Sequence, residues 1–368
     1  MGIDFKNPTP LYLQIVNDIR NRIVAGEFII GEQLASHQEL AREYSVSLIT
    51  VKKALTELIH QGVLFSRIGK GTFVARPSAP VDFSKHRTIG LVLSDLKNPF
   101  FSLILHSVEQ KISENDYNLL LSNSSKQIEK EESQIHRFQD IGVDGMIIAS
   151  TSHVYRASET IRKLKNENFP FVMVSYIVDE DIYFVGTDHE QGAFMATEHL
   201  IQQGYKRIGY ISGEEGNLLG ELRKKGYIRA LQQYGKKYIE HFVFQLPLER
   251  NDYQSGYQIG EQFFKLSDRP DAVFVYKDLA ALGFEQAMLD QGKKVPDDVA
   301  IVGFDDIEGS RYAHVPLTTI HQPTDEIGKL AVETLIRCIE GREIEIHTIL
   351  APKLVIRKSC GAKEKLSK

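Results

Sequence analysis

The sequence predicts a small unit of three helices and a β-hairpin, followed by a larger α/β domain of two lobes that each contain a parallel sheet. Three observations predict this arrangement. Helix-period apolar residues and helix-capping signals occupy residues 8–76. A stretch with two prolines and no periodicity follows at 77–86. From 87 to 358, continuous apolar runs alternate with amphipathic stretches, which is typical of parallel sheets covered by helices on both faces.

Composition and charge are those of a soluble globular protein. Hydrophobic residues make up 42% and charged residues 25% of 368 residues, a length that predicts more than one core. No apolar run is long enough to span a bilayer, the start lacks a secretory pattern, and two cysteines predict no disulfide framework, so we expect a cytoplasmic location. Residues 1–76 hold 9 Lys/Arg against 7 Asp/Glu, and the remainder holds 35 against 42. This balance permits a mildly basic module attached to an acidic body.

The first two predicted helices begin with capping signals. Thr9 is expected to cap a helix that has Pro10 at its first position, and Gly26 ends it. Four apolar residues at every fourth position give this helix one apolar face: Leu11, Ile15, Ile19 and Ile23. A second helix begins at Ser36, where Ser-His-Gln-Glu has the spacing of a capping box.

A third helix and a hairpin complete this unit. Ser47 is expected to cap a helix that runs to about Gln61. The inward stripe of this helix is predicted to be Val51, Leu55, Leu58 and Ile59. Two β-prone runs at 63–65 and 72–74 enclose a tip with two glycines and two basic residues. Such a tip lets the backbone approach a phosphate chain closely.

These segments resemble the winged helix-turn-helix domain of the GntR family over its whole length. The resemblance rests on PLYLQIVNDIRNRIVAGEF, GEQL, SHQELAREYSVS, TVKKALTELIHQGVLF and GKGTFVA. It implies a dimer that binds duplex DNA, with the third helix in the major groove and the hairpin, or wing, at the minor groove. The residues implied to contact bases or phosphates are Gln38, Ser47, Leu48, Ile49, Thr50 and Lys52, with Arg67, Lys70 and Gly71 in the wing.

The positions that read bases depart from the family pattern. The family usually has arginine where this chain has Gln38, Leu48 and Lys52. Arginine pairs with guanine, whereas glutamine suits adenine and apolar side chains suit the thymine methyl group. The sequence therefore favours an A·T-rich half-site. Arg42 and Lys53 are interpreted instead as part of a solvated helix face.

The segment 77–86 is predicted to be an extended, moderately stiff tether. LacI-type repressors place a short DNA-contacting helix at this point, and the prolines of this segment disfavour one. We therefore expect an effector signal to pass through the geometry of a dimer.

Polar residues that follow the strands of the second unit are the expected ligand contacts, because ligands of such sheets bind beyond the carboxyl ends of the strands. The residues singled out are Asp95, Phe100, Ser150 and Tyr176 in the first lobe, and Arg223, Lys277, Asp305 and Gln322 in the second. Hydrogen-bonding groups around an aromatic platform such as Phe100 suit a polyhydroxylated ligand. Ser150, Asp188 and Asp278 also hold such positions, and a helix-capping role is an equal alternative for each.

Essentially all of residues 87–358 resemble the LacI/GalR effector domain, which is related to periplasmic sugar-binding proteins. The resemblance rests on SDLKNPFFSLILHSVEQ, DGMIIAS, TEHLIQQGYKRIGYISG, RKKGYIRAL, DAVFVYKDLAALGF, VPDDVAIVGFDD and PLTTIHQP. It implies a two-lobed, periplasmic-binding-protein-like fold that dimerises and binds a sugar, or in some members a purine or phosphosugar. Arg223 and Asp305 are implied to bind ligand hydroxyls. The expected lobes are 87–187 with 324–346 and 188–320 with 347–358, before a tail at 359–368.

Two departures from this second family bear on the ligand. The family often has Asp-Arg where this chain has Ser175-Tyr176, and usually Asn-Asp where this chain has Lys277-Asp278. Lys277 beside Arg223 would neutralise the carboxylate or phosphate of an acidic sugar. The favoured alternative is that Lys277 pairs with Asp278 or Asp305, which leaves a neutral sugar as the expected effector.

The two modules together resemble arabinose-repressor-like hybrid regulators. They predict a dimeric, sugar-responsive transcriptional repressor, with an activator as the alternative, whose partners are an operator duplex and a small effector but no membrane. Sequence motifs for a nucleophile or a metal site are absent, so no enzyme, cofactor or metal is expected. A solute-binding protein fits less well, because it needs a signal peptide and no DNA-binding module.

Overall fold

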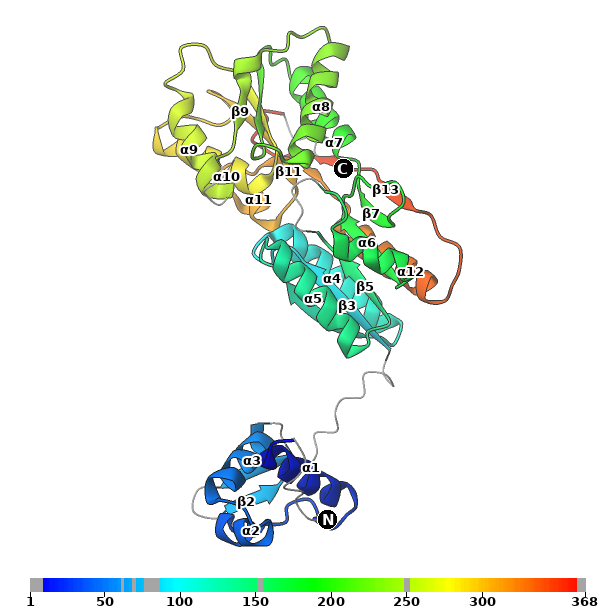
Figure 1. The fold of residues 1–368 in the computed structure, drawn as a ribbon. Coiled ribbons are helices and arrows are strands. Elements are labelled where there is room, and N and C mark those ends of the chain that lie inside the picture. The colour runs from blue at the N-terminus through cyan, green and yellow to red at the C-terminus, as the bar shows by residue number, and fades with distance from the viewer. Residues whose placement is uncertain are drawn as a thin grey trace. The chain divides into compact units, whose positions relative to one another are not determined.

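The computed structural model describes residues 9–60, 63–67, 71–75, 87–150, 155–247 and 252–362. The chain forms two units, Met1–Asp82 and Phe83–Lys368 (Figure 1). The predicted tether at 77–86 lies outside the described residues, and so does Lys70 of the predicted wing tip.

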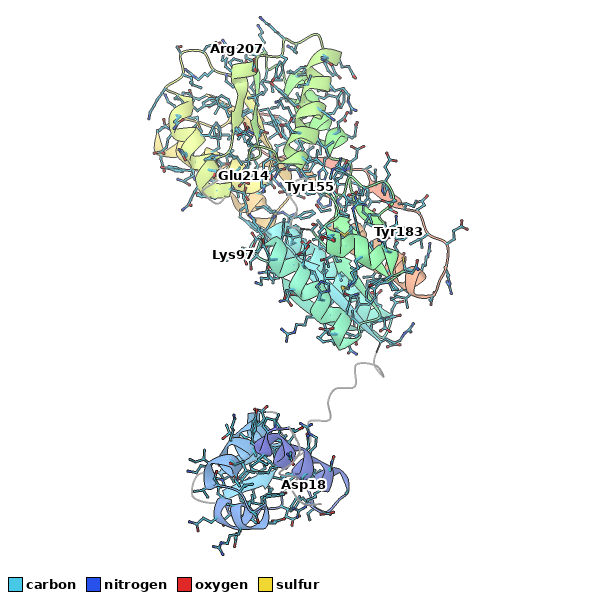
Figure 2. The ribbon with its side chains drawn as sticks, viewed as in Figure 1. Asp18, Lys97, Tyr155, Tyr183, Arg207 and Glu214 are labelled. Carbon is cyan, nitrogen blue, oxygen red and sulfur yellow. The ribbon has the colours of Figure 1, made fainter. Side chains whose placement is uncertain are left out.

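The first unit is a winged helix-turn-helix domain. Its elements are α1 (Leu11–Val24), α2 (His37–Glu43), α3 (Leu48–His60), β1 (Leu64–Arg67) and β2 (Gly71–Val74). The two strands are antiparallel, with Leu64 opposite Val74 at one end of the hairpin. Both of these side chains are buried and close a core formed by the three helices. The Tyr44 hydroxyl, just after α2, donates a 2.7 Å hydrogen bond to Asp18 of α1. Asp18 is labelled in Figure 2.

Local signals in the sequence predicted the helix starts of this unit with one exception. The Ser36 hydroxyl accepts a 3.3 Å hydrogen bond from the Glu39 N–H, and the Glu39 carboxylate accepts one of 2.7 Å from the Ser36 N–H. These two bonds confirm the capping box. The prediction for Thr9 is wrong, because Pro10 is the N-cap residue of α1 and no side chain caps this helix. Ile59 was expected in the core but is 36% exposed.

The second unit contains two six-stranded sheets. The first sheet has the strand order β13-β7-β6-β5-β3-β4, and all its described neighbours are parallel. Its strands are β3 (Thr88–Leu93), β4 (Asn118–Asn123), β5 (Gly145–Ile148), β6 (Phe171–Ser175), β7 (Phe184–Thr187) and β13 (His347–Leu350). Four of these strands, β3, β5, β6 and β7, are buried along almost their whole length, as the continuous apolar runs predicted.

The second sheet has the order β14-β12-β11-β10-β8-β9. Its strands are β8 (Ile208–Ser212), β9 (Val243–Gln245), β10 (Ala272–Val275), β11 (Ala300–Asp305), β12 (Thr318–His321) and β14 (Lys353–Val355). The neighbours are parallel except at one edge, where β14 runs antiparallel to β12. The sheet is therefore mixed at this edge, whereas the sequence predicted a purely parallel one.

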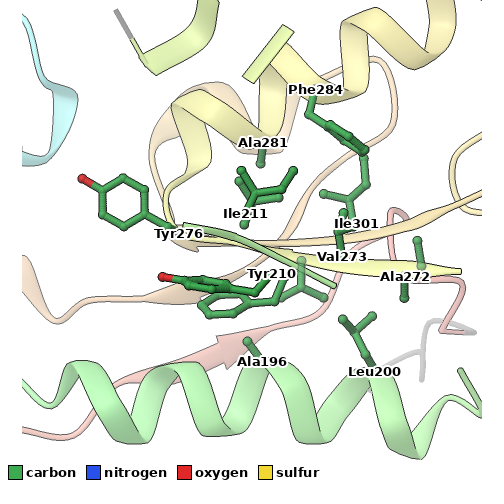
Figure 3. Packing of buried hydrophobic residues seen from close by; sticks show 14 of the residues in the cluster. Ala196, Leu200, Tyr210, Ile211, Ala272, Val273, Tyr276, Ala281, Phe284 and Ile301 are labelled. Carbon is green, nitrogen blue, oxygen red and sulfur yellow. The ribbon is translucent and has the colours of Figure 1, made fainter. Parts of the chain in front are cut away.

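Helices cover both sheets. Those of the first lobe are α4 (Pro99–Glu114), α5 (Ile128–Ile141), α6 (Glu159–Asn166) and α12 (Thr324–Ile339). Those of the second lobe are α7 (His189–Gln202), α8 (Leu218–Gln233), α9 (Asp252–Phe263), α10 (Asp278–Asp290) and the short α11 (Glu308–Tyr312). Figure 3 shows Ala196 and Leu200 of α7 on one face of the second sheet and Ala281 and Phe284 of α10 on the other. This double cover explains why strands such as β10 contain apolar residues only.

The C-terminal part of the chain differs from the predicted boundaries. Residues 347–358 were expected in the second lobe, but β13 pairs with β7 of the first sheet. The predicted tail at 359–368 begins inside the fold, because Ser359 and Cys360 are fully buried and the Ser359 hydroxyl donates to the Ile301 carbonyl at 2.7 Å. These contacts join residues far apart in sequence, so local patterns do not predict them. Over the described ranges, no helix is long and apolar enough to cross a membrane.

Candidate DNA-binding surface and effector site

The N-terminus of α3 presents two apolar side chains to solvent. Ile49 is 79% exposed and Leu48 is 38% exposed, and Lys52 is exposed one turn further along. The Ser47 hydroxyl accepts a 3.2 Å hydrogen bond from the Thr50 N–H, and the two hydroxyl oxygens of these residues lie 2.8 Å apart. Ser47 therefore caps α3, as the sequence predicted, and its contact with DNA stays a prediction.

The polar residues of α2 divide into those with partners inside the domain and those that are exposed. Glu39 belongs to the capping box, and the Glu43 carboxylate accepts a 2.7 Å hydrogen bond from Arg22. Gln38 and Arg42 are exposed on the same helix. The acidic charges of this helix are thus engaged locally, which leaves a polar and cationic surface.

The hairpin holds an arginine beside two aromatic rings. Phe65 and Phe73 stack with their centroids 5.5 Å apart, and the Arg67 guanidinium lies 5.4 Å and 5.6 Å from these rings. Gly71, opposite Arg67, has a φ of +106°, and a Cβ there would lie 2.6 Å from the Gln33 amide nitrogen. The wing therefore needs glycine at this position. Lys53 is exposed, but its ammonium lies 4.0 Å from the centre of the Tyr12 ring, so it is not simply solvated.

Arg223 of α8 is the centre of a buried polar cluster in the second lobe. Its side chain is 3% exposed and lies 3.7 Å from the Asp305 carboxylate. The guanidinium stacks on the Phe304 ring at 3.6 Å and donates to the Tyr276 carbonyl. The Arg223 Nε is buried without a hydrogen-bond partner. A buried donor of this kind needs an acceptor, and a ligand hydroxyl would supply one.

Asp305 ends β11 in a conformation that favours glycine. Its φ is +120°, and Asp306 follows with a φ of +57°. The Gln322 side chain donates a 2.7 Å hydrogen bond to the Asp305 carboxylate. Burial raises the pKa of Asp305, while Arg223 acts in the opposite direction. Asp306 belongs to another group of residues, since its carboxylate accepts a 2.6 Å hydrogen bond from Arg357.

Lys277 has a partner that the sequence did not predict. Its ammonium lies 3.0 Å from the carboxylate of Asp252 in α9, and both side chains are only about one-sixth exposed. Burial alone would lower the pKa of Lys277, but the adjacent Tyr276 and Asp252 raise it, so the lysine is charged. The expected pairing with Asp278 or Asp305 is therefore wrong.

The side chains of Asp278 and Asp188 both accept hydrogen bonds from other groups of the protein. The Asp278 carboxylate accepts hydrogen bonds from the Ser310 and Thr319 hydroxyls at 2.6 Å and from the Ile307 N–H at 3.1 Å. Asp188 caps α7 by accepting a 2.8 Å hydrogen bond from a backbone N–H. Asp188 thus has the helix-capping role that was the alternative to ligand binding, whereas Asp278 does not cap α10 and instead binds residues that follow β11 and lie on β12. Within the described residues, no group of three or more His, Cys, Asp or Glu side chains is placed to hold a metal ion.

Three of the predicted first-lobe residues contact partners in their own lobe. Asp95 lies 3.7 Å from the Lys126 ammonium, and the Ser150 hydroxyl donates to Glu131 at 3.2 Å. Phe100 is 5% exposed and packs in the apolar core of this lobe. A ligand role for these residues remains a prediction, and the burial of Phe100 makes it a poor aromatic platform.

Tyr176, the fourth residue predicted in the first lobe, is connected to Arg223 through His189. Its ring centre lies 6.1 Å from that of His189, whose Nδ1 is 3.3 Å from Arg223 Nη2. Burial and the neighbouring guanidinium lower the pKa of His189 well below its ordinary value, so the imidazole is neutral. The sequence patterns did not indicate this contact of His189. Its position directly after the Asp188 cap was the available signal.

Tyr155 is a second residue that the sequence did not single out. Its ring lies 6.2 Å from that of Tyr176, and its φ of +50° is unusual for tyrosine. Burial raises its pKa, and the charges that act on it include those of Lys277, Arg223 and Glu214 of the second lobe. Figure 2 shows Tyr155 and Glu214 where the two lobes face each other. The tyrosine follows β5, so a search of strand ends extended by a few residues would have found it.

Two family models match this chain. Residues 11–74 match the bacterial regulatory proteins of the gntR family. Residues 197–360 match the periplasmic binding protein-like domain. The two matches fall on the winged helix-turn-helix domain and on most of the second lobe with the C-terminal helix and strands.

Similar proteins are named as transcriptional regulators. The arabinose metabolism transcriptional repressor of Geobacillus stearothermophilus is 32% identical over 95% of this chain and 97% of its own length. The transcriptional regulator CelR in its cellobiose complex has a TM-score of 0.66 and 26% identity, covering 85% of this chain and 91% of that one. A LacI family regulator from Enterococcus faecium with bound ribose has a TM-score of 0.65 and 28% identity, covering 74% of this chain and 98% of that one.

Proposed function

We propose that a neutral sugar bound beside Arg223 controls the affinity of this protein for an operator. The premise is that the chain belongs to the family of bacterial transcriptional repressors that join a GntR-type DNA-binding domain to a periplasmic binding protein-like domain. The chain is a repressor of this type with a sugar-binding effector domain. The proposal concerns the class of the sugar, the residues that bind it and the response of the protein.

The arrangement of Arg223, Asp305 and Gln322 carries this proposal. A guanidinium and a carboxylate 3.7 Å apart offer a donor and an acceptor to neighbouring hydroxyls of a sugar ring. The unpaired Arg223 Nε supplies a further donor. Gln322 orients the Asp305 carboxylate through its 2.7 Å hydrogen bond, and the Phe304 ring centre lies 3.6 Å from the guanidinium carbon. These groups lie at the carboxyl ends of β11 and β12 and on α8, where ligands of such sheets bind.

The charges around Arg223 favour a neutral ligand. Arg223 is matched by Asp305, and Lys277 is matched by Asp252 at 3.0 Å. The two cations are therefore already compensated by two carboxylates, and Glu214 adds negative charge nearby. A uronate or sugar phosphate would have to break a largely buried ion pair to reach Lys277. Arabinose and ribose are the first sugars to test, given the names of the relative and of the ribose complex.

We further propose that the protein acts as a dimer in the cytoplasm, where a repressor meets its operator. Leu103 of α4 and Leu121 of β4, on two elements that contact each other, are 39% and 42% exposed. Burial of this surface against a second copy would remove apolar area from water. Sugar binding would then change the distance between the paired winged helices and lower operator affinity. The proposal contains no catalytic step, since the relatives are named as regulators.

Isothermal titration calorimetry of the full chain tests the effector class. The panel contains arabinose, ribose and cellobiose against galacturonate, ribose 5-phosphate and hypoxanthine. We expect a neutral sugar to bind, and Gln322→Leu to weaken it by about tenfold or more, since a hydrogen bond to a charged group is lost. Gln286→Leu, an exposed glutamine of α10, is the matched control and should bind normally. Binding of the acidic compounds alone would refute a neutral effector.

A further inference from the structure

The first turn of α3 exposes two neighbouring apolar side chains, whereas most apolar side chains further along the helix are buried and only Ile59 near its end is 36% exposed. Val51, Ala54, Leu55 and Leu58 are each at most 2% exposed and face the core. Ile49 is 79% exposed, and Leu48 beside it is 38% exposed. Neighbouring apolar side chains held in water at a helix terminus mark a surface that binds a partner. In a winged helix-turn-helix repressor, that partner is the major groove of DNA.

The polar groups near Ile49 leave little other means of reading bases. The Ser47 and Thr50 hydroxyls are 2.8 Å apart, and Ser47 also caps the helix. No arginine lies on α3, where the described cations are Lys52 and Lys53, and the ammonium of Lys53 lies over the Tyr12 ring. Lysine is able to bind guanine or a phosphate, but its ammonium lacks the planar pair of donors with which arginine reads guanine.

Apolar side chains recognise one feature of the major groove, the C5 methyl group of thymine. We propose that Ile49, supported by Leu48, reads thymine methyl groups in each operator half-site, and that the exposed Gln38 of α2 favours adenine nearby. This inference rests on DNA binding by the winged helix-turn-helix domain and adds the class of base that it selects. The contact would explain why Ile49 is exposed to water in the free protein, because bound operator DNA would bury this side chain.

A change of single atoms in the DNA tests the inference without altering the protein. Duplexes that bind the full chain are first selected from a random pool, and each thymine is then replaced singly by uracil, which lacks only the methyl group. We expect at least one position per half-site to lose about fourfold in affinity, the equivalent of one buried methylene, and the other positions to lose nothing.

A protein variant then assigns the lost methyl contact to one side chain. Ile49→Ala should bind the thymine duplex about as weakly as the unaltered protein binds the uracil duplex, and should show no further loss on uracil. Ile30→Ala is the matched control: Ile30 is 57% exposed in the same domain and precedes Gly31, whose N–H donates to Val74 away from the wing tip. This variant should discriminate thymine from uracil as the unaltered protein does.

Three outcomes overturn the inference while leaving DNA binding intact. These are a guanine-centred half-site, a selected duplex in which no thymine is sensitive to uracil, and an Ile49→Ala variant that still discriminates the two bases. Failure to enrich any duplex would instead contradict DNA binding itself. One series of measurements therefore distinguishes the choice of base from DNA binding itself.

Discussion

Replacing the buried Asp278 tests how the second lobe holds the residues around Arg223. The side chain is fully buried, and its two oxygens form three hydrogen bonds, with Ser310, Thr319 and the Ile307 N–H. Burial is the main cause that raises its pKa to about 8, with the nearby Asp305 adding to the shift. At neutral pH the carboxyl group is therefore mostly protonated in the folded protein, where its proton is donated to the Ser310 or the Thr319 hydroxyl, and ionised in the unfolded chain.

The expected effects follow from the groups that each variant leaves unpaired. Asp278→Ala removes the partner of three buried polar groups, each worth about 1–3 kcal/mol, so a loss of about 3 kcal/mol or more in the free energy of unfolding is expected at pH 7. Asp278→Asn has nearly the shape of the protonated acid and keeps one carbonyl oxygen. The Thr319 or Ser310 hydroxyl can rotate to accept from its amide. We expect it to cost about 1 kcal/mol or less.

The pH dependence separates this explanation from a simple loss of contacts. Because the pKa of Asp278 is raised on folding, its protonation favours the folded state most at low pH, and this advantage is lost as the pH rises toward 8. Relative to Asp278→Asn, the unaltered protein should therefore lose stability on the order of 1 kcal/mol per pH unit between pH 5 and pH 8. The relative cost of Asp278→Asn should shrink over the same interval.

Urea unfolding of the full chain, followed by circular dichroism from pH 5 to pH 9, measures this difference. Asp290→Asn is the matched control, because Asp290 lies on the exposed side of the same helix, where it accepts hydrogen bonds from Tyr257 and Gln286. A stability difference between the unaltered protein and Asp278→Asn that does not change with pH would refute a raised pKa at Asp278.

Three further predictions concern the winged helix and the effector site. Arg67→Ala should weaken binding to all duplexes alike and reduce the slope of log affinity against log salt by about 1, measured by fluorescence anisotropy; a change in base preference would contradict this role. Ser36→Ala removes the capping box of α2 and should lower the free energy of unfolding by about 1 kcal/mol in urea titrations. An unchanged free energy would show that the box does not stabilise this helix. Asp252→Asn should free Lys277 and allow galacturonate to bind, whereas Asp252→Asn combined with Lys277→Met should not, as calorimetry would measure.

Features set by neighbouring residues could be predicted from the sequence, and features set by distant ones could not. The capping box at Ser36 depends on a spacing of three residues, and the burial of β10 depends on its own side chains. Strand β13 pairs with β7, which precedes it by about 160 residues, and only the folded chain brings the two together. The burial of Ser359 was likewise not predictable from its neighbours, because it depends on a hydrogen bond from its hydroxyl to the distant Ile301 carbonyl.

The same distinction holds within the effector site. Arg223 and Asp305 follow from motif positions and lie 3.7 Å apart, and Gln322 contacts Asp305 directly. The partner of Lys277 lies on α9, and no pattern near the lysine indicates Asp252. A motif was therefore sufficient to predict that Arg223 and Asp305 lie near each other, while their contact with a ligand stays a prediction. The pairing of charges was not predictable, because it depends on which helix packs beside a given strand.

His189 connects Arg223 to the first lobe, so a movement of the Arg223 side chain would affect residues of that lobe. The imidazole contacts Arg223 on one side and faces the Tyr176 ring on the other, and Tyr176 in turn faces Tyr155. Because burial keeps the imidazole neutral, it accepts from the guanidinium through Nδ1 without repelling it. A sugar that binds the unpaired Nε of Arg223 would reorient the same guanidinium. The change would pass through His189 to two aromatic side chains of the first lobe, so these side-chain contacts would couple sugar binding to the relative position of the lobes.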